Sequence, residues 1–238
     1  MQVTLTLRPE EPDYGPWQTL NLSELLSALF PNGVKPGEPR ILAIDGRSGS
    51  GKTTLAARLA SEVSGSAVVH TDDQPASANW RGPEAQATIL SDPVPEGCSW
   101  FDWEEAVLAN ILEPHKRGEP VTYRPASWDD WNRGEGAIEI LPDCPLLILE
   151  GVGAGRLEFS PLVDKSVWVQ SDFDLARVRG IARDGEAYRD EAEIVWDKFM
   201  AEELPFLAQQ KPWLRADKVV LGNAAAEKLG PETVFVSV

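Results

Sequence analysis

An eight-residue segment in the first quarter of the chain constrains the fold more than any other feature. Residues 46–53 read Gly-Arg-Ser-Gly-Ser-Gly-Lys-Thr and match the pattern G-x-x-x-x-G-K-[ST] at every position. The apolar run 41–44 precedes this loop as a strand would, and residues 54–60 follow it with the composition of a helix. A Gly/Ser turn that happens to precede a helix would not explain the strand, the loop and the helix together. The segment therefore predicts a phosphate-binding loop, or P-loop, for a nucleotide triphosphate.

The chemistry expected of the P-loop follows from its residue types. Its glycines let backbone N–H groups turn inward around a phosphate, and the positive end of the new helix faces the same anion. We expect Lys52 to reach the β- and γ-phosphates and the Thr53 hydroxyl to hold Mg²⁺. The predicted cofactors are therefore ATP and Mg²⁺. The predicted nucleotide-binding residues are Gly46, Ser48, Gly49, Ser50, Gly51, Lys52, Thr53 and Thr54.

Length and charge exclude several other classes of protein. The 238 residues suffice for one α/β domain with a sizeable core, which is favoured over two small domains. A formal net charge of −16 argues against a nucleic-acid partner, because most of the surface would repel a phosphate backbone. The two cysteines lack metal-binding spacing, and neither a signal peptide nor a membrane-spanning segment is visible. We expect a cytoplasmic protein with no membrane partner.

Two later strands are expected to end in acidic residues beside the P-loop. The buried-type strand 67–70 is followed by Asp72 and Asp73, and the apolar strand 145–151 carries Glu150 near its carboxyl end. The carboxyl ends of the strands form the ligand-binding edge of an open parallel sheet. An aspartate there can take a hydroxyl proton or hold a Mg²⁺ water, and Glu150 has the position of an acid that acts near the metal. The alternative for the aspartate pair is a cap of the following turn.

Two features close to these acids are expected to have structural roles. His70 ends the strand 67–70 and is expected to pack there rather than to act in catalysis. Residues 151–155 are rich in glycine but lack the spacing of a dinucleotide-binding loop. We expect them to form a tight turn that lets the backbone approach the substrate.

Arginines on a later helix are expected to form a lid over the phosphates. Arg179 and Arg183 lie four residues apart, on one face of a helix capped by Asp172. The alternative is a solvated basic stripe paired with nearby acids. On so acidic a chain we favour a phosphate clamp, because such arginines neutralise charge on the transferred phosphoryl group.

The chain as a whole predicts one domain, 1–238, with a doubly wound, mainly parallel sheet in a three-layer α/β/α arrangement. Residues 1–39 are interpreted as an N-terminal strand-helix extension of that domain, with a partner-facing arm as the alternative, and residues 74–140 as a substrate-flap and acceptor region. No sequence signature fixes an oligomeric state. Further elements are expected as strands at 3–7, 121–128, 137–141, 165–170, 217–223 and 233–237, and as helices at 21–29, 84–90, 101–112 (capped by Asp102), 186–209 and 224–229.

With these segments placed, the chain resembles the uridine kinase group of P-loop kinases, which also takes in phosphoribulokinase and bacterial pantothenate kinase. The resemblance implies a P-loop NTPase fold of the nucleoside-kinase type and transfer of the ATP γ-phosphoryl group to a hydroxyl of a small metabolite, with a uridine-like nucleoside favoured. It covers residues from about 40 to 223. The segments that carry it are the P-loop, Asp72-Asp73, Phe101-Asp102-Trp103, Tyr123-Arg124-Pro125, Glu150-Gly151 and the Arg-x-x-x-Arg-Asp pattern at 179–184.

The resemblance also implies roles for individual residues. Asp72 would be the catalytic base, Glu150 would assist at the metal with Thr53 and Asp72, and Arg179 and Arg183 would contact the ATP phosphates. The candidate acceptor-binding residues are Asp73, Trp103, Tyr123 and Arg124.

The acceptor half departs from the uridine kinase pattern. Gln74-Pro75-Ala76 stand where aromatic residues would follow the catalytic aspartate, and Trp103 replaces the expected histidine. Pantothenate, a sugar phosphate or a nucleoside monophosphate are therefore alternative acceptors. An ATP-binding regulatory module without kinase activity is a further alternative.

Overall fold

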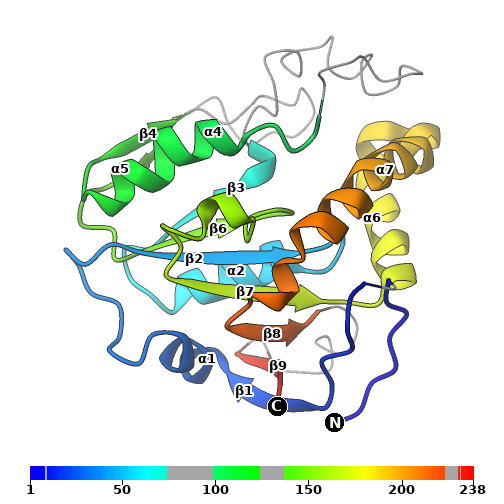
Figure 1. The fold of residues 1–238 in the computed structure, drawn as a ribbon, viewed down its shortest axis with the longest axis horizontal. Coiled ribbons are helices and arrows are strands. Elements are labelled where there is room, and N and C mark those ends of the chain that lie inside the picture. Colours follow the sequence, from blue (N-terminus) through cyan, green and yellow to red (C-terminus); the bar gives the residue numbers. More distant parts are fainter. Residues whose placement is uncertain (9, 74–98, 124–136, 223–229, 231) are drawn as a thin grey trace.

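A seven-stranded sheet in the order β1-β9-β8-β7-β2-β6-β3 forms the centre of the fold (Figure 1). The computed structural model describes residues 1–8, 10–73, 99–123, 137–222, 230 and 232–238. Strands β3, β6, β2, β7 and β8 are parallel to their neighbours, whereas β9 and β1 are added antiparallel at one edge. The strands are β1 Trp17–Asn21, β2 Arg40–Gly46, β3 Ala67–His70, β6 Leu146–Glu150, β7 Lys165–Gln170, β8 Lys218–Leu221 and β9 Thr233–Ser237.

The register of the parallel strands sets which side chains meet at the carboxyl edge of the sheet. Strand β2 is buried along most of its length because it lies between β6 and β7. Ile44 pairs with Glu150 of β6, and Glu150 pairs in turn with His70 of β3. The P-loop leaves β2 two residues beyond Ile44. Glu150 and His70 are therefore placed beside it by backbone pairing alone.

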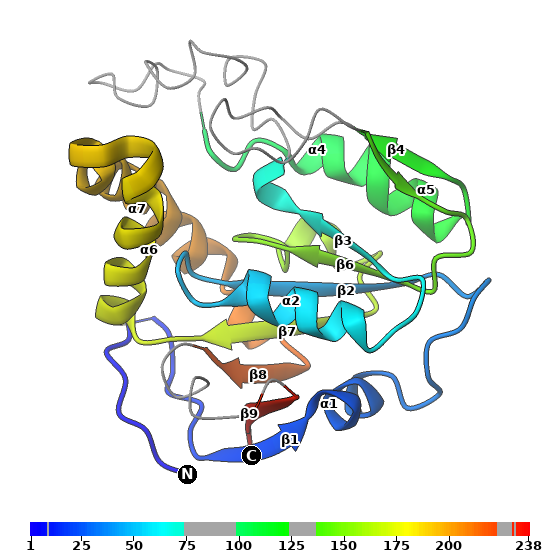
Figure 2. The ribbon, with the colours of Figure 1, turned by 180° about the vertical axis from the view of Figure 1, so that it is seen from behind.

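Helices cover both faces of the sheet and complete the expected three layers. Helices α1 and α2 lie on one face and α7 crosses the other, as the two opposite views show (Figures 1 and 2). Leu25 of α1 and Leu59 of α2 are fully buried in one apolar cluster with β2 and β6, while Leu207 of α7 packs in another with Trp168 of β7. The helices are α1 Leu22–Leu29, α2 Lys52–Ser61, α4 Glu104–Val107, α5 Glu113–Lys116, α6 Phe173–Tyr188 and α7 Ala192–Gln210.

The N-terminal segment confirms one expectation and corrects another. The helix expected at 21–29 is α1, and it begins with a capping box: the Asn21 side chain accepts the Glu24 N–H at 2.8 Å, and the Glu24 carboxylate accepts the Asn21 N–H at 2.8 Å. The strand expected at 3–7 is wrong. Thr6 donates its N–H to Asp172 at 2.7 Å and accepts the Phe173 N–H at 2.9 Å, so its backbone bonds to the start of α6 and joins no sheet.

Two predicted helix boundaries were also wrong. The helix expected at 101–112 begins as α4 with Trp103, not Asp102, at its N-cap, and continues through a π-helical turn, Leu108–Leu112, into α5. The helix expected at 186–209 begins at Ala192, because α6 continues to Tyr188 and a 3₁₀ turn separates the two. Within the described residues, no helix is both long and apolar enough to cross a membrane.

The other expected elements were found where the structure describes them. The strands expected at 121–128 and 137–141 are β4 (Val121–Tyr123) and β5 (Ile138–Ile140), which pair antiparallel. The closing strand is β9, and the late strand is β8. The helices expected at 84–90 and 224–229, and the part of the first hairpin strand beyond residue 123, lie outside the described residues.

Candidate active site

The P-loop has a conformation that only glycine permits at its centre. Gly49 has a φ of +73°, and a Cβ there would lie 2.3 Å from the Ala176 carbonyl oxygen of α6. Lys52 is only 7 % exposed, and its ammonium group donates to the Arg47 carbonyl at 3.0 Å. The Lys52 side chain therefore folds back across the loop instead of extending into solvent. This is where the positive charge is needed if the loop holds phosphate.

Glu150 connects the P-loop to the neighbouring strand. Thr53 Oγ1 donates to Glu150 Oε1 at 3.1 Å, and His70 Nδ1 lies 2.5 Å from Glu150 Oε2. Burial raises the pKa of Glu150, but the hydrogen bond with His70 and the charge of Lys52 lower it by more, so the pKa lies below its usual range. Glu150 is therefore a carboxylate at neutral pH.

The pair of Thr53 and Glu150 fits a magnesium ion. A hydroxyl and a carboxylate supply hard oxygen atoms, and Mg²⁺ in proteins takes few protein ligands and completes its shell with phosphates and water. No cluster of three or more histidine, cysteine, aspartate or glutamate side chains in the described part of the chain is arranged to hold a metal by itself. The expected assignment of Asp72 to the same metal stays a prediction.

His70 is a residue whose part in the site the sequence analysis missed. It was expected to pack at the strand end, and it does end β3, but its imidazole bonds the acid next to the P-loop. A signal was available in the sequence. Strands 67–70 and 145–151 were both predicted in a parallel sheet, and aligning their carboxyl ends would have put His70 within one residue of Glu150.

The two aspartates after β3 differ sharply in accessibility. They belong to the 3₁₀ turn Thr71–Asp73, in which Asp72 is exposed and Asp73 is 1 % exposed. The turn sits tightly against the end of β6, since a Cβ on Gly151 would lie 1.7 Å from Thr71 Oγ1. Asp72 is therefore the carboxylate of this pair that a substrate can reach. Its role as base, and that of Asp73 in acceptor binding, stay predictions.

Helix α6 carries the two arginines that were expected to form a lid. Its first turn is capped as predicted, because Asp172 Oδ1 accepts the Leu175 N–H at 2.9 Å. Arg179 is half-buried and Arg183 is exposed, on the helix whose residue Ala176 contacts the P-loop. Their role as a lid over the phosphates stays a prediction.

A buried carboxylate of α7 touches the P-loop from the opposite side. Both oxygens of Glu203 lie 3.2 Å from the Ser48 N–H, and the side chain is fully buried. Burial raises the pKa of Glu203, although the nearby charges of Lys52 and Arg47 lower it in part. Sequence analysis missed this residue, because an acidic pair within a long helix reads as a solvent-facing pair.

The glycine-rich turn at 151–155 serves a different purpose from the one expected. The buried carboxylate of Asp45 accepts the N–H groups of Gly46 at 2.7 Å, Gly153 at 3.0 Å and Gly155 at 2.9 Å. The turn thus wraps around Asp45 and ties the start of the P-loop to the end of β6. Its backbone N–H groups at 153 and 155 are directed to this acid rather than to a substrate.

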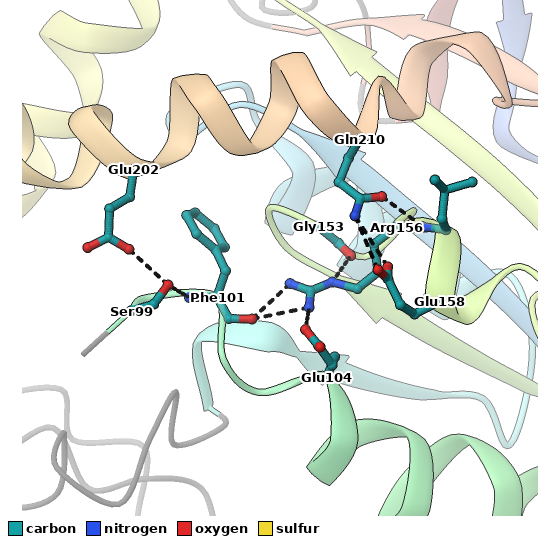
Figure 3. Close-up of polar contacts among 9 residues, drawn as sticks. Ser99, Phe101, Glu104, Gly153, Arg156, Glu158, Glu202 and Gln210 are labelled. Atoms are coloured by element: carbon teal, nitrogen blue, oxygen red, sulfur yellow. Dashed lines mark hydrogen bonds and ion pairs between the residues drawn. The ribbon is translucent and has the colours of Figure 1, made fainter. Parts of the chain in front are cut away.

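The region expected to bind the acceptor contains a buried arginine. Arg156 is 2 % exposed, donates to the Phe101 carbonyl from both Nη atoms at 3.1 Å, and pairs with Glu104 (Figure 3). Its guanidinium lies 4.1 Å from the centre of the Trp103 ring. Trp103 itself is 3 % exposed, so it supports Arg156 from the core and does not form the open wall that was expected.

The remaining acceptor candidates were placed only in part. Tyr123 ends β4, is half-buried and packs against the same apolar cluster as Trp103. Arg124 lies outside the described residues, as do segments 74–98 and 124–136 of the expected flap.

The base of that flap is fastened to α7. One oxygen of Glu202 accepts the Ser99 hydroxyl at 3.0 Å (Figure 3). The same oxygen accepts the Trp100 N–H, also at 3.0 Å. Phe101 stacks on Phe206 of the same helix, with ring centres 4.4 Å apart and planes 6° from parallel. Helix α7 therefore contacts the P-loop through Glu203 and the expected acceptor region through Glu202.

Comparison with solved structures gives this fold two clear neighbours. A "possible uridine kinase" from Bacillus stearothermophilus is 23 % identical with a TM-score of 0.53, and the match covers 83 % of this chain and 96 % of that one. A "putative fructose transport system kinase" from a Silicibacter species is 22 % identical with a TM-score of 0.58, over 79 % and 95 %. No protein-family model and no curated protein sequence matches the chain. The likenesses confirm the expected fold, that of the uridine kinase-like P-loop kinases.

Proposed function

We propose that this protein is an ATP-dependent kinase that transfers the γ-phosphoryl group to a hydroxyl of a small metabolite, with a uridine-like nucleoside favoured. One observation carries the proposal. Thr53 of the P-loop is hydrogen-bonded to the buried carboxylate of Glu150, and the exposed Asp72 follows the neighbouring strand at the same sheet edge. A phosphate loop, a metal-binding pair and an accessible base are the parts that phosphoryl transfer requires.

Each residue has a defined task in this reaction. Lys52 neutralises charge on the β- and γ-phosphates, and Arg179 and Arg183 close over the transferring group. Asp72 accepts the proton of the attacking hydroxyl. Thr53 and Glu150 would hold Mg²⁺, which would supply positive charge to neutralise the phosphates.

The exposed Asp72 favours a kinase over an ATP-binding regulatory module. A module that only binds nucleotide has no need for an accessible carboxylate two residues beyond β3, whereas a kinase needs one within reach of an acceptor. The names of the two structural neighbours, one a uridine kinase and one a kinase of fructose transport, support acceptors that present a sugar hydroxyl. Pantothenate, a sugar phosphate and a nucleoside monophosphate are the alternative acceptors.

The proposal is tested by measuring ADP release against a panel of acceptors. Purified protein with ATP and Mg²⁺ would be assayed with nucleosides, hexoses, sugar phosphates, pantothenate and nucleoside monophosphates in turn. We expect one class to raise ADP release far above the rate without acceptor, with uridine or cytidine first. A slow rate that no acceptor changes would instead identify the regulatory module.

A further inference from the structure

The N-terminal segment reaches the P-loop through one buried carboxylate. Glu11 is 4 % exposed and forms an ion pair with Arg47, the second residue of the P-loop, which is 3 % exposed. The charges of Glu203 and Asp172 also act on Arg47. In the described part of the chain, however, Glu11 is the one acid that forms an ion pair with its guanidinium. Removing one charge of a pair so deeply buried leaves the other without compensation.

The Glu11 carboxylate is itself held by β7, which pairs with β2, the strand that leads into the P-loop. Its Oε1 atom accepts the Trp168 Nε1–H at 2.9 Å and the Gln170 Nε2–H at 3.1 Å. Gln170 also donates to the Pro12 carbonyl at 2.8 Å, so the backbone next to Glu11 is fixed to the same strand. The carboxylate therefore presents its other oxygen, Oε2, to Arg47 from a fixed position.

The same segment is fastened to the start of α6, beside which it runs in both views (Figures 1 and 2). The Thr6 carbonyl accepts the Phe173 N–H at 2.9 Å. The Arg8 guanidinium lies 3.5 Å from the centre of the Phe173 ring, and that of Arg47 lies 5.3 Å from it. Thr6, Arg8 and Glu11, which we call the N-terminal strap, thus connect β7, α6 and the P-loop.

The backbone of Arg47 connects the strap to the residue expected to bind phosphate. The Arg47 carbonyl accepts the Lys52 ammonium at 3.0 Å and the Ser50 N–H at 3.1 Å. If the Arg47 guanidinium lost its partner, it would move toward solvent, because a buried charge without a partner is costly. That movement would displace the carbonyl of the same residue and the two groups that bond to it.

We propose that Glu11 is a positioning residue of the nucleotide site. It fixes Arg47, and through the Arg47 carbonyl it fixes the Lys52 ammonium and the P-loop in the conformation that binds phosphate. A loop that is ordered before its ligand arrives loses less conformational entropy on binding. The inference rests on the proposed function in one respect, that the P-loop holds a nucleotide, and it requires no particular acceptor.

The test is the affinity of the full-length protein for ADP with Mg²⁺, measured by isothermal calorimetry below the thermal unfolding midpoint of each variant. Glu11→Gln keeps an oxygen that can accept from β7 but removes the charge that pairs with Arg47. We expect its affinity for ADP to fall about tenfold or more. Glu10→Gln is the matched control, because Glu10 is exposed and carries the same charge one residue away. Its affinity should be unchanged.

A double variant separates this role from a general loss of stability. If Glu11 acts through Arg47, adding Glu11→Gln to Arg47→Gln should weaken ADP binding no further than Arg47→Gln does alone. A merely structural contribution of Glu11 would lower the unfolding temperature and leave the ADP affinity of the folded protein unchanged. Glu11→Asp, which keeps the charge but withdraws it from Arg47, serves if Glu11→Gln does not fold, and should weaken binding about threefold.

Three results would overturn the proposal. The first is unchanged ADP affinity in folded Glu11→Gln or Glu11→Asp protein, and the second is an equal loss of affinity in Glu10→Gln. The third is a double variant that loses affinity by the product of the two single effects, because Glu11 would then act independently of Arg47. Failure of the proposed kinase reaction looks different, since ADP would still bind while no acceptor raised its release.

Discussion

The proposed donor half, around the P-loop, and the proposed acceptor half, around Phe101 and Arg156, are built by different means. In the donor half, backbone conformation sets the geometry: a positive φ at Gly49, the parallel register that puts Glu150 between Ile44 and His70, and the start of α2 at Lys52. Once the backbone is placed in this way, the side chains of these residues lie close enough to bond one another. This half is local to one short motif and the strands beside it.

In the acceptor half, side chains from remote parts of the chain hold a segment that has little regular structure. Phe101 is held by Arg156, and Ser99 by Glu202, across 55 and 103 residues of sequence. No backbone register specifies these contacts. The difference teaches that a phosphate site can be recognised from eight residues, whereas an acceptor site depends on contacts that become visible only in the folded chain. The following predictions test this division, starting with the largest effect.

Lys52→Ala should abolish the function of the donor half and leave the acceptor half unaffected. It removes the charge that would stabilise the transferring phosphoryl group, and we expect turnover to fall about 10³-fold or more. ADP release measures the loss, and far-UV circular dichroism should show an intact fold. The exposed Lys35 is the control, because Lys35→Ala removes the same charge far from the loop. Normal turnover in folded Lys52→Ala protein would refute the assignment of the phosphate site.

Asp72→Asn should separate the two halves by retaining ATP binding and losing transfer. Loss of a general base costs about 10²–10⁴-fold in rate. Calorimetric ATP affinity and acceptor-dependent ADP release measure the two properties independently. Asp73→Asn is the matched variant, and since Asp73 is 1 % exposed, it should retain more activity. The opposite ranking would make Asp73 the base.

His70→Ala tests whether the acid beside the P-loop depends on its imidazole partner. The variant loses the 2.5 Å contact with Glu150, so we expect the Mg²⁺ concentration for half-maximal activity to rise about 10–100-fold. The acceptor KM should not change. His115, the other histidine of the chain, bonds the Arg40 carbonyl in the core, and His115→Gln should leave the Mg²⁺ requirement unaltered.

Glu202→Gln should weaken the acceptor half and leave the donor half intact. The carboxylate is replaced by a neutral group that bonds Ser99 and Trp100 less strongly, so the acceptor KM should rise about threefold to tenfold. The KM for ATP should stay constant. Glu193→Gln, an exposed position on the same helix, provides the control. Parallel changes in both KM values would show that the two halves cannot be separated at α7.

Glu203→Gln should change how stability depends on pH. Burial raises the folded-state pKa of Glu203 above its ordinary value of 4.5, so its stabilising contribution is complete below that value and is lost as pH rises through the folded-state pKa. Glutamine can still accept the Ser48 N–H but carries no charge. The free energy of unfolding would be measured by urea titrations between pH 4 and pH 8. That of the variant should therefore rise relative to that of the wild type as pH increases. A constant difference across this range would contradict the prediction.

Sequence reasoning succeeded where a residue pattern has one structural solution. The strand–loop–helix of the P-loop, the parallel strands around it, helix α1, and strands β4 and β5 each follow from a pattern of residues close together in the sequence. The acidic strand ends followed from the parallel sheet.

It failed where side chains from distant elements decide the outcome. The alternating pattern at 3–7 looks like a strand, but its backbone bonds to the start of α6, and the predicted helix start at 101 is displaced because Arg156 and Phe206 hold Phe101. Glu203 looked solvent-exposed because a sequence does not show which face of a long helix meets a loop. Trp103 was predicted to bind the acceptor but lies in the core beside Arg156. No local sequence pattern predicts that Arg156 is buried.

The adjacency of Glu202 and Glu203 has a consequence for how this chain can vary in length. Neighbouring residues of a helix point about 100° apart, so each meets a different partner, and Gln210 adds a third contact by accepting the Leu157 N–H at 2.9 Å. A single residue inserted or deleted before these positions in α7 would rotate all three side chains away from their partners together. Insertions should therefore be tolerated at the chain's surface loops and excluded from α7, which fixes the spacing between the P-loop and the segment around Phe101.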